Sequence, residues 1–315
     1  MADRPPPLAV DLESGLPPDV TGTVATVGTF DGVHRGHEDV LRRLAARAKD
    51  AGLRSVLVTF SGHPLELLRP EQAPLQLTPG REKLEALAPT GLDYVAVLPF
   101  TPALAALEAD AFVDRVLIDR LRMRALLVGH DHGFGRGRSG HADTLQALGA
   151  ERGFDVEVIE PVRVDGGVTV SSSAVRRAIE TGDLVQASAL LGRDYGALGT
   201  VVRGEQRGRL LGYPTLNVAL PEPRKLLPPD GVYAVRVQTP SGAFGGMLNL
   251  GGRPTFGDDA RSLEAHLFDA DGDWYGRTVR VDFVRRLRDV QRFPAADALV
   301  AQLHEDARAA RAALR

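Results

Sequence analysis

The stretch VATVGTFDGVHRGH, residues 24–37, decides the fold of the first half of the chain. It opens with a β-branched run, passes through a glycine-rich turn and leads into a helical pattern expected at about 38–49. Backbone amides at the start of a helix attract phosphate. The stretch therefore predicts a strand, a turn and a helix with a phosphate site at the turn.

Two histidines, His34 and His37, stand three residues apart in this stretch. This spacing puts them on one face of the first helical turn. Two imidazoles beside a helix start can stabilise the charge that develops on a triphosphate as pyrophosphate leaves. A histidine pair alone is more often structural, and the complete run from Gly28 to His37 favours the phosphate interpretation.

Outward from this stretch, strand-like runs alternate with helical patterns. We expect strands at 24–27, 55–60, 94–98, 125–128 and 156–159, and helices at 38–49, 103–121 and 144–152. This alternation predicts an α/β domain with a parallel, Rossmann-like sheet covered on both faces. Ligands of such sheets bind beyond the carboxyl ends of the strands.

The pattern changes after about residue 197. Strand-like runs separated by Gly, Pro and Asp turns are expected at 199–203, 232–238, 245–250, 263–268 and 278–284, with one helix at about 295–314. This indicates an antiparallel β-barrel with a C-terminal helix. The length of 315 residues agrees with two domains, which we place at 1–190 and 191–315.

Composition excludes several classes of protein. The net charge of -3 gives no reason to expect nucleic acid or a membrane surface as a partner. The chain has no cysteine, which excludes disulfides, thiolate metal sites and cysteine nucleophiles. Neither an apolar signal region in residues 1–13 nor a membrane-spanning stretch is present, so we expect a cytoplasmic location. The sequence leaves the oligomeric state open.

Two further segments of the first half carry candidate phosphate ligands. The serines at 171–173 lead into a helix that ends near Gly182, and Ser173 has a simple interpretation as the helix N-cap. The better candidates for phosphate donors are Ser171, Ser172 and Arg176. A glycine-rich loop at 128–140, which a solvated loop would also explain, carries Asp131, Arg136 and Arg138.

These segments resemble the HxGH nucleotidylyltransferases, and within them the FMN adenylyltransferase module of prokaryotic bifunctional riboflavin kinase/FAD synthetases. The matching motifs are G-x-F-D-G-x-H-x-G-H at 28–37, T-F-x-x-H-P at 59–64 and S-S-S/T-x-[IV]-R at 171–176. The resemblance implies an ATP site at Gly28, Phe30, Asp31, His34, His37, Asp131, Ser171, Ser172 and Arg176, and a flavin site at His63, Pro64 and Arg136. Where the family usually has an aromatic and then a basic residue, this chain has His132 and Gly133.

The second half contains a glycine-rich, basic loop, GTVVRGEQRGRLLGYPTLN at 199–217, which could fold over phosphates or form a plain surface hairpin. Thr215 and Asn217 share a face of an extended stretch and could offer hard oxygens to Mg²⁺. In the strand at 263–268, apolar residues alternate with Glu264, His266 and Phe268, an arrangement that also suits a solvated face. Phosphorylation of an alcohol needs a base, and Glu264 is the natural candidate.

This half resembles the riboflavin kinase domain, with its glycine-rich flap, its P-T-A-N metal motif and its catalytic strand E-x-H-x-x-D. The corresponding residues are 204–212, 214–217 and Glu264 to Asp269. The resemblance implies ATP binding by Gly204, Arg207, Gly208, Arg209, Thr215 and Asn217, Mg²⁺ binding by Thr215 and Asn217, and flavin binding by Asn249, Gly251 and Arg288. Leu216 replaces the family's Ala, and Val290 stands where a Glu is common.

Together the two resemblances cover about residues 24–311 in the family's order. They imply that the C-terminal domain phosphorylates riboflavin to FMN and the N-terminal domain adenylylates FMN to FAD, both with ATP. The expected partners are the small molecules riboflavin, FMN and ATP. One alternative is another HxGH class, such as a pantetheine-phosphate adenylyltransferase or a cytidylyltransferase, fused to an unrelated barrel. Another is a flavin-sensing protein without turnover.

Overall fold

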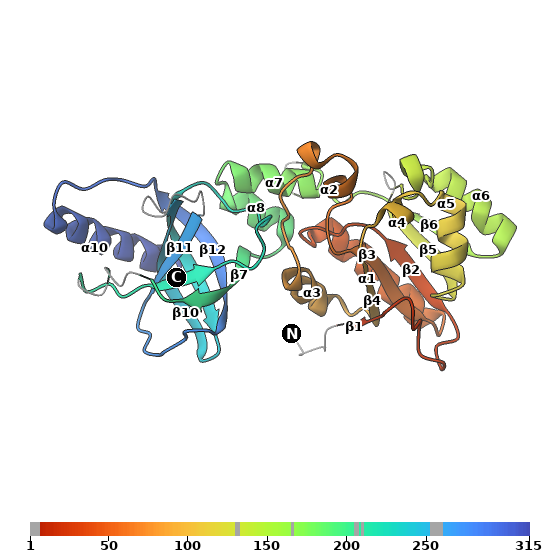
Figure 1. Ribbon diagram of the computed structural model, residues 1–315, viewed down its shortest axis with the longest axis horizontal. Coiled ribbons are helices and arrows are strands. Elements are labelled where there is room, and N and C mark those ends of the chain that lie inside the picture. Colours follow the sequence, from red (N-terminus) through yellow and green to blue (C-terminus); the bar gives the residue numbers. More distant parts are fainter. Residues whose placement is uncertain (1–6, 130–132, 165–166, 205–207, 209–210, 253–260) are drawn as a thin grey trace. The chain divides into compact units, whose positions relative to one another are not determined.

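The computed structural model describes residues 7–129, 133–164, 167–204, 208, 211–252 and 261–315. The chain forms two compact units, residues 1–172 and 173–315, each with its own sheet and core. In Figure 1 the first unit runs from red to green and the second from green to blue. The boundary predicted at residue 190 lies after two helices, α7 (Ser172–Glu180) and α8 (Leu184–Leu191), and stays a prediction.

The first unit is built on a parallel sheet with the strand order β1-β4-β3-β2-β5-β6. The predicted Rossmann-like sheet is therefore confirmed, and β1, a two-residue edge strand, was not predicted. The strands are β1 (Leu8–Ala9), β2 (Thr23–Val27), β3 (Arg54–Phe60), β4 (Tyr94–Leu98), β5 (Met123–Gly129) and β6 (Asp155–Ile159).

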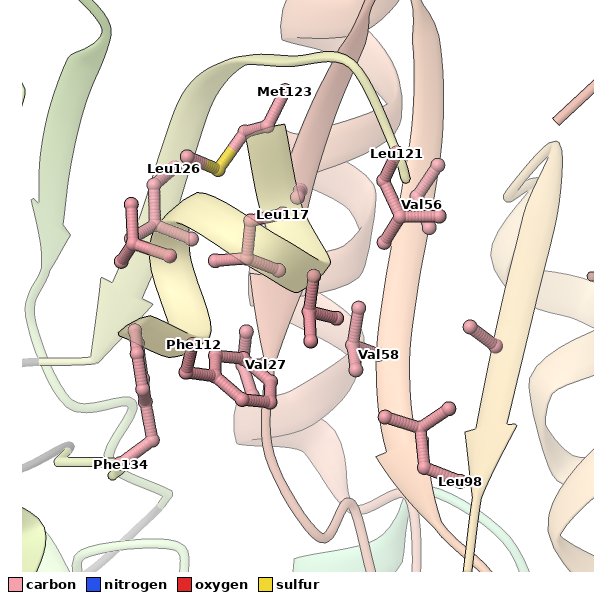
Figure 2. Packing of buried hydrophobic residues seen from close by; sticks show 14 of the residues in the cluster. Val27, Val56, Val58, Leu98, Phe112, Leu117, Leu121, Met123, Leu126 and Phe134 are labelled. Atoms are coloured by element: carbon pink, nitrogen blue, oxygen red, sulfur yellow. The ribbon is translucent and has the colours of Figure 1, made fainter. Parts of the chain in front are cut away.

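Both faces of this sheet are buried, which explains why its strands are almost continuously hydrophobic. Along β3, Val56 and Val58 belong to one buried cluster while Leu57, between them, belongs to another. Figure 2 shows the first cluster, in which Phe112 and Leu117 from the segment after β4 cover the strand residues. On the other face the cover is provided by Leu41 and Leu44 of α1 (Arg35–Asp50) and by Leu87 of α3 (Arg81–Leu87).

The helix predicted at 103–121 is wrong as one continuous helix. The structure has α4 (Pro102–Ala105), α5 (Ala109–Phe112) and a π-helical segment η3 (Val113–Ile118). The interruption coincides with a contact from a distant loop, because Leu107 O accepts a hydrogen bond from Arg136 N at 2.8 Å and Glu108 is extended. Remaining helical elements are α2 (Leu65–Leu68), η1 (Pro70–Gln72), η2 (Ala88–Thr90), η4 (Arg136–Arg138) and α6 (Ala142–Arg152).

The second unit contains a closed barrel with the strand order β10-β11-β8-β7-β12-β9, whose neighbouring pairs are antiparallel. This confirms the predicted barrel and its C-terminal helix, α10 (Ala296–Ala313). No helix in the described ranges is long and apolar enough to cross a membrane. The strands are β7 (Tyr195–Val202), β8 (Leu216–Ala219), β9 (Gly231–Thr239), β10 (Gly242–Gly252), β11 (Arg261–Leu267) and β12 (Thr278–Arg288).

A buried ion pair fastens α10 to the barrel. Arg288 at the end of β12 donates from Nε and Nη2 to the two carboxylate oxygens of Asp306, at 2.9 and 2.7 Å. The side chains of Arg288 and Asp306 are only 16% and 4% exposed, and Gln302 Nε2 also donates to Asp306. The planar guanidinium fork suits this two-point contact, which an ammonium could not reproduce. The pair therefore fixes both the position and the rotation of the helix.

We expect Arg288→Met to lower the free energy of unfolding of the second unit by about 3 kcal/mol, because it leaves a buried carboxylate without its counter-charge. Trp274 is the single tryptophan of the chain and lies buried in this unit, so its fluorescence during urea unfolding measures the effect. Arg308→Met, which removes an exposed pair with Glu305 on the same helix, is the matched control. Equal stabilities of the two variants would contradict the prediction.

Candidate active sites

The turn after β2 has an unusual backbone. Phe30, Gly32 and Val33 all have positive φ angles, of 44°, 88° and 39°. For the two residues with side chains, this conformation costs roughly 1–2 kcal/mol each. A Cβ atom at position 32 would lie 2.7 Å from Leu77 Cδ1, and with the positive φ angle this makes glycine the residue best suited to the position. Contacts with other parts of the chain must therefore hold this turn in place.

Asp31 supplies the main anchor of the turn. Its carboxylate is buried and accepts hydrogen bonds from Leu77 N and Thr78 N, each at 2.9 Å. Thr78 Oγ1 also accepts from Gly32 N at 2.8 Å, and Ser172 Oγ donates to Asp31 O at 2.8 Å. Backbone amides thus hold the Asp31 carboxylate inside the protein. Its predicted role in ATP binding stays a prediction.

Lys83 on α3 is a second anchor, and one that the sequence analysis missed. Its Nζ donates to Thr29 O at 2.9 Å and to Phe60 O at 2.7 Å, which joins the turn after β2 to the end of β3. Thr59 Oγ1 donates to the same Thr29 oxygen at 3.0 Å. Burial lowers the pKa of Lys83 to about 8, although the charges of Asp31 and Glu66 act in the opposite direction.

The two histidines lie together at the start of α1. His34 is the N-cap residue, and its Nδ1 accepts a hydrogen bond from His37 N at 3.2 Å. Because Nδ1 is the acceptor, the ring proton of neutral His34 is on Nε2, which becomes a donor. The two rings stack with centroids 3.7 Å apart, and the Phe30 ring lies 4.5 Å from that of His37. The turn therefore positions both imidazoles.

The ring of His63, in the turn after β3, is oriented by a backbone amide in the same way as that of His34. Its Nδ1 accepts from Leu65 N at 3.2 Å, which leaves Nε2 as the donor of the neutral ring. Glu66 Oε1 accepts from His63 N at 3.1 Å and from Gln76 Nε2 at 2.6 Å. The segment that carries Leu77 and Thr78 therefore supports this second turn as well.

These turns surround a cavity of about 920 Å³ at the carboxyl end of the parallel sheet. This is where open α/β sheets bind their ligands. Phe60, Phe100 and Phe112 contribute an apolar wall. The predicted site residues that line the cavity are Gly28, Phe30, His34, His37, His63, Pro64, Arg136, Ser171 and Ser172.

Other predicted residues of this site lie elsewhere. Asp131 lies outside the described residues, as does His132. Arg176 is on α7 in the second unit, so its proposed role in the first site stays a prediction. Ser173 lies within α7, which begins at Ser172, so its interpretation as the N-cap is wrong. Arg136 is largely exposed and forms an ion pair with Glu108 at 3.5 Å.

In the second unit the barrel register aligns three predicted residues. Glu264 on β11 is directly opposite Asn217 on β8 and Asn249 on β10. Residues opposite each other in antiparallel strands point to the same face, so the three side chains form one row. Leu263 and Ala265, on the other face of β11, are buried. Asn217 is buried too, and Ser262 Oγ lies 3.5 Å from Glu264 Oε1.

The loop before β8 passes close to this row. A Cβ atom at Gly204 would lie 2.2 Å from Asn217 Nδ2, and one at Gly208 would lie 2.3 Å from Tyr213 O. Both glycines therefore permit a close backbone approach. Arg207 and Arg209 lie outside the described residues.

Two contacts hold the predicted metal motif at 214–217. His266 Nδ1 lies 2.8 Å from Pro214 O and must be the donor, because a carbonyl only accepts. Tyr213 OH forms a 2.7 Å hydrogen bond with His304 Nδ1 on α10. Thr215 and Asn217 offer hydroxyl and amide oxygens, and the described residues contain no cluster of three His, Cys, Asp or Glu side chains suited to a metal.

The two remaining predicted flavin contacts differ in their surroundings. Gly251 on β10 is buried two residues from Asn249, and therefore on the same side of the strand. The Arg288 guanidinium forms hydrogen bonds with both carboxylate oxygens of Asp306. Flavin binding by these residues stays a prediction.

Comparison with known proteins also divides the chain into two parts. Residues 16–174 match the FAD synthetase family, and residues 191–314 match the riboflavin kinase family. The chain is 43% identical over 298 residues to a bifunctional riboflavin kinase/FMN adenylyltransferase of Pseudomonas fluorescens, with 94% of each chain covered. It is 41% identical to the protein of the same description from Escherichia coli K12, with 92% of each covered.

One solved structure is similar across both units. The crystal structure of a macrolide-efflux protein from Streptococcus pneumoniae matches with a TM-score of 0.84 and 31% sequence identity. The match covers 95% of this chain and 96% of that one.

We expect a pH-dependent contribution of Lys83 to stability. Its pKa is about 8 in the folded chain and about 10.5 in an unfolded one, so between these values only the unfolded chain binds the proton. The free energy of unfolding should therefore rise with pH through this window, and the Lys83 contribution should be lowest below it. Denaturant unfolding of Lys83→Met should lack this rise, whereas Lys49→Met, at an exposed lysine, should keep it. Parallel pH curves for the wild type and Lys83→Met would contradict the prediction.

Proposed function

Because the chain belongs to the family of bifunctional riboflavin kinase/FMN adenylyltransferases, we propose that its two units divide the two reactions between them. The chain phosphorylates riboflavin to FMN and adenylylates FMN to FAD, and each step consumes ATP. The observation that carries the division is the position of the two family matches, at 16–174 and 191–314. The alternative of an HxGH enzyme fused to an unrelated barrel is contradicted by the second match.

Adenylylation takes place in the cavity of the first unit. A phosphate oxygen of FMN attacks the α-phosphorus of ATP, the bond to the bridging oxygen breaks, and pyrophosphate leaves. The nucleophile is already ionised at neutral pH, so the reaction needs no general base. It needs donors for the charge that develops on the phosphates. His34 Nε2 and the His37 ring, stacked at the helix start, are suited to that role.

The flavin of FMN would occupy the apolar side of the same cavity. Phe60, Phe100 and Phe112 line it, and an extended aromatic ring gains free energy by leaving water for such a wall. His63 and Pro64 border this region, which supports their predicted role in flavin binding. Arg136 also lines the cavity, which supports its predicted role in flavin binding, and its guanidinium could bind the FMN phosphate.

Phosphorylation of riboflavin takes place beside the row on β8, β10 and β11. The riboflavin hydroxyl attacks the γ-phosphorus of ATP, the bond to the bridging oxygen breaks, and ADP leaves. The hydroxyl is a weak nucleophile until its proton is removed, and the Glu264 carboxylate accepts that proton. Asn217, opposite Glu264 in the register, places an amide next to the base.

We further propose Mg²⁺ as the cation of the kinase reaction, held by Thr215 and Asn217. Mg²⁺ prefers oxygen ligands and commonly keeps water and substrate phosphates among them, so a small set of protein oxygens is sufficient. When bound, it would neutralise charge on the phosphate oxygens. Both reactions consume ATP, which supports a cytoplasmic location.

His37→Ala should halt FAD formation while FMN still accumulates from riboflavin. Loss of one pre-organised donor to a developing phosphate charge typically lowers the rate by about 10² to 10³. Chromatography of the products from riboflavin and Mg-ATP measures both steps at once. His141→Ala, at the N-cap position of α6, removes another histidine from a helix start and should leave both rates unchanged. Normal FAD synthesis by the His37 variant would contradict the proposed role of His37 as a donor to the phosphates.

Glu264→Gln keeps the shape of the side chain but removes its ability to accept a proton. FMN formation from riboflavin should fall by roughly 10² to 10⁴, which is the usual contribution of general-base catalysis. Supplied with FMN, the same variant should form FAD at the normal rate. Unchanged phosphorylation would show that Glu264 is only part of a solvated strand face. Failure of both reactions with an unchanged melting curve would contradict the two-site assignment.

A further inference from the structure

One segment, residues 76–83, contacts both turns that build the cavity of the first unit. Gln76 bonds to Glu66 in the turn after β3. Leu77 N and Thr78 N bond to the Asp31 carboxylate in the turn after β2. At its end, Lys83 reaches the Thr29 and Phe60 carbonyls.

The Lys83 contacts determine how one peptide unit of the turn is oriented. In a trans peptide the carbonyl and the following N–H point in opposite directions. Lys83 Nζ holds Thr29 O on the protein side, so the N–H of Phe30 points away from Lys83. Phe30 also lines the cavity and packs its ring against His37. The orientation of this peptide therefore influences both a backbone donor and an imidazole at the cavity.

Lys83 also adds a charged link between two neighbouring strands, beside the hydrogen bonds from Gly28 N to Val58 O and from Thr59 Oγ1 to Thr29 O. Its two strongest contacts, at 2.9 and 2.7 Å, are to carbonyls that follow β2 and end β3. These strands carry the histidine turn and the His63 turn respectively. The Lys83 side chain is buried and does not line the cavity. It can act on the reaction only through the residues that it holds.

We propose that Lys83 is a positioning residue for adenylyl transfer, which sets the turn at 28–34 so that its donors meet the nucleotide phosphates. The inference rests on the adenylylation assigned above to the first unit. Two of the turn's side-chain-bearing residues have a strained backbone, so the turn should shift when the Thr29 carbonyl loses Lys83 and keeps only the hydrogen bond from Thr59 Oγ1. Small displacements of donors affect the transition state more than the bound substrate.

The test compares Lys83→Met with Lys83→Arg in the full chain, with FMN and Mg-ATP as substrates. The Met variant keeps the buried stem but has no donor, and its kcat for FAD formation should fall by about 10-fold to 100-fold, with KM for FMN within about threefold of wild type. The Arg variant keeps charge and donors and should recover most of kcat. A purely structural role would not produce this split between kcat and KM.

Arg122→Met is the matched control. Arg122 Nη1 donates to Val20 O and Pro17 O, so it also caps carbonyls with a cation, but at the opposite, amino end of the sheet. It should leave kcat unchanged even where it lowers the melting temperature. Riboflavin phosphorylation by each variant shows whether the second unit is still active.

The outcomes separate the inference from the function on which it rests. If the wild type forms no FAD, the assigned adenylylation fails. If the wild type forms FAD and Lys83→Met keeps kcat within about twofold, or if the Met and Arg variants lose kcat equally while folded, the inference about Lys83 is overturned. If Lys83→Met does not fold, Lys83→Leu, which also has no donor, takes its place with the same thresholds.

Discussion

The adenylylation site depends on one interaction: the buried carboxylate of Asp31 accepts hydrogen bonds from two backbone amides. The turn that carries Asp31 has left-handed backbone at three positions and would not keep this shape alone. The carboxylate binds it to residues 77–78, which the chain reaches only after the helix α1, the strand β3 and two short helical elements. A local motif in the sequence therefore acquires its geometry from a distant segment, and the stacked histidines follow from that geometry.

The two units meet different chemical demands with different structural means. Transfer to an ionised phosphate needs donors, and a strained turn at the end of a parallel strand presents imidazoles and amides together. Transfer to an alcohol needs a proton acceptor in a defined position. The proposed acceptor, Glu264, is on a barrel strand, and the register places it between Asn217 and Asn249. Hydrogen bonds between strands make that placement rigid without any strained backbone.

The sequence predicted the two folds and many residues of the first cavity, since periodicity and short motifs are local properties. It could not predict where the Asp31 carboxylate points, because its partners Leu77 and Thr78 are amides that any residue except proline provides. Lys83 was missed for a related reason, as a lysine on a short helix usually faces solvent. The break near Leu107 was also hidden, because it coincides with a hydrogen bond from the distant loop at 136.

The close contact between position 32 and Leu77 has a consequence for how such a chain can change by successive mutation. A side chain at 32 has no room until Leu77 has become smaller, and even then it must tolerate a left-handed backbone. The two positions are therefore coupled: a smaller residue at 77 would relieve the steric contact at 32 but not the strain of the left-handed backbone. Amino-acid changes at positions 32 and 77 therefore depend on each other, although 45 positions separate them along the chain.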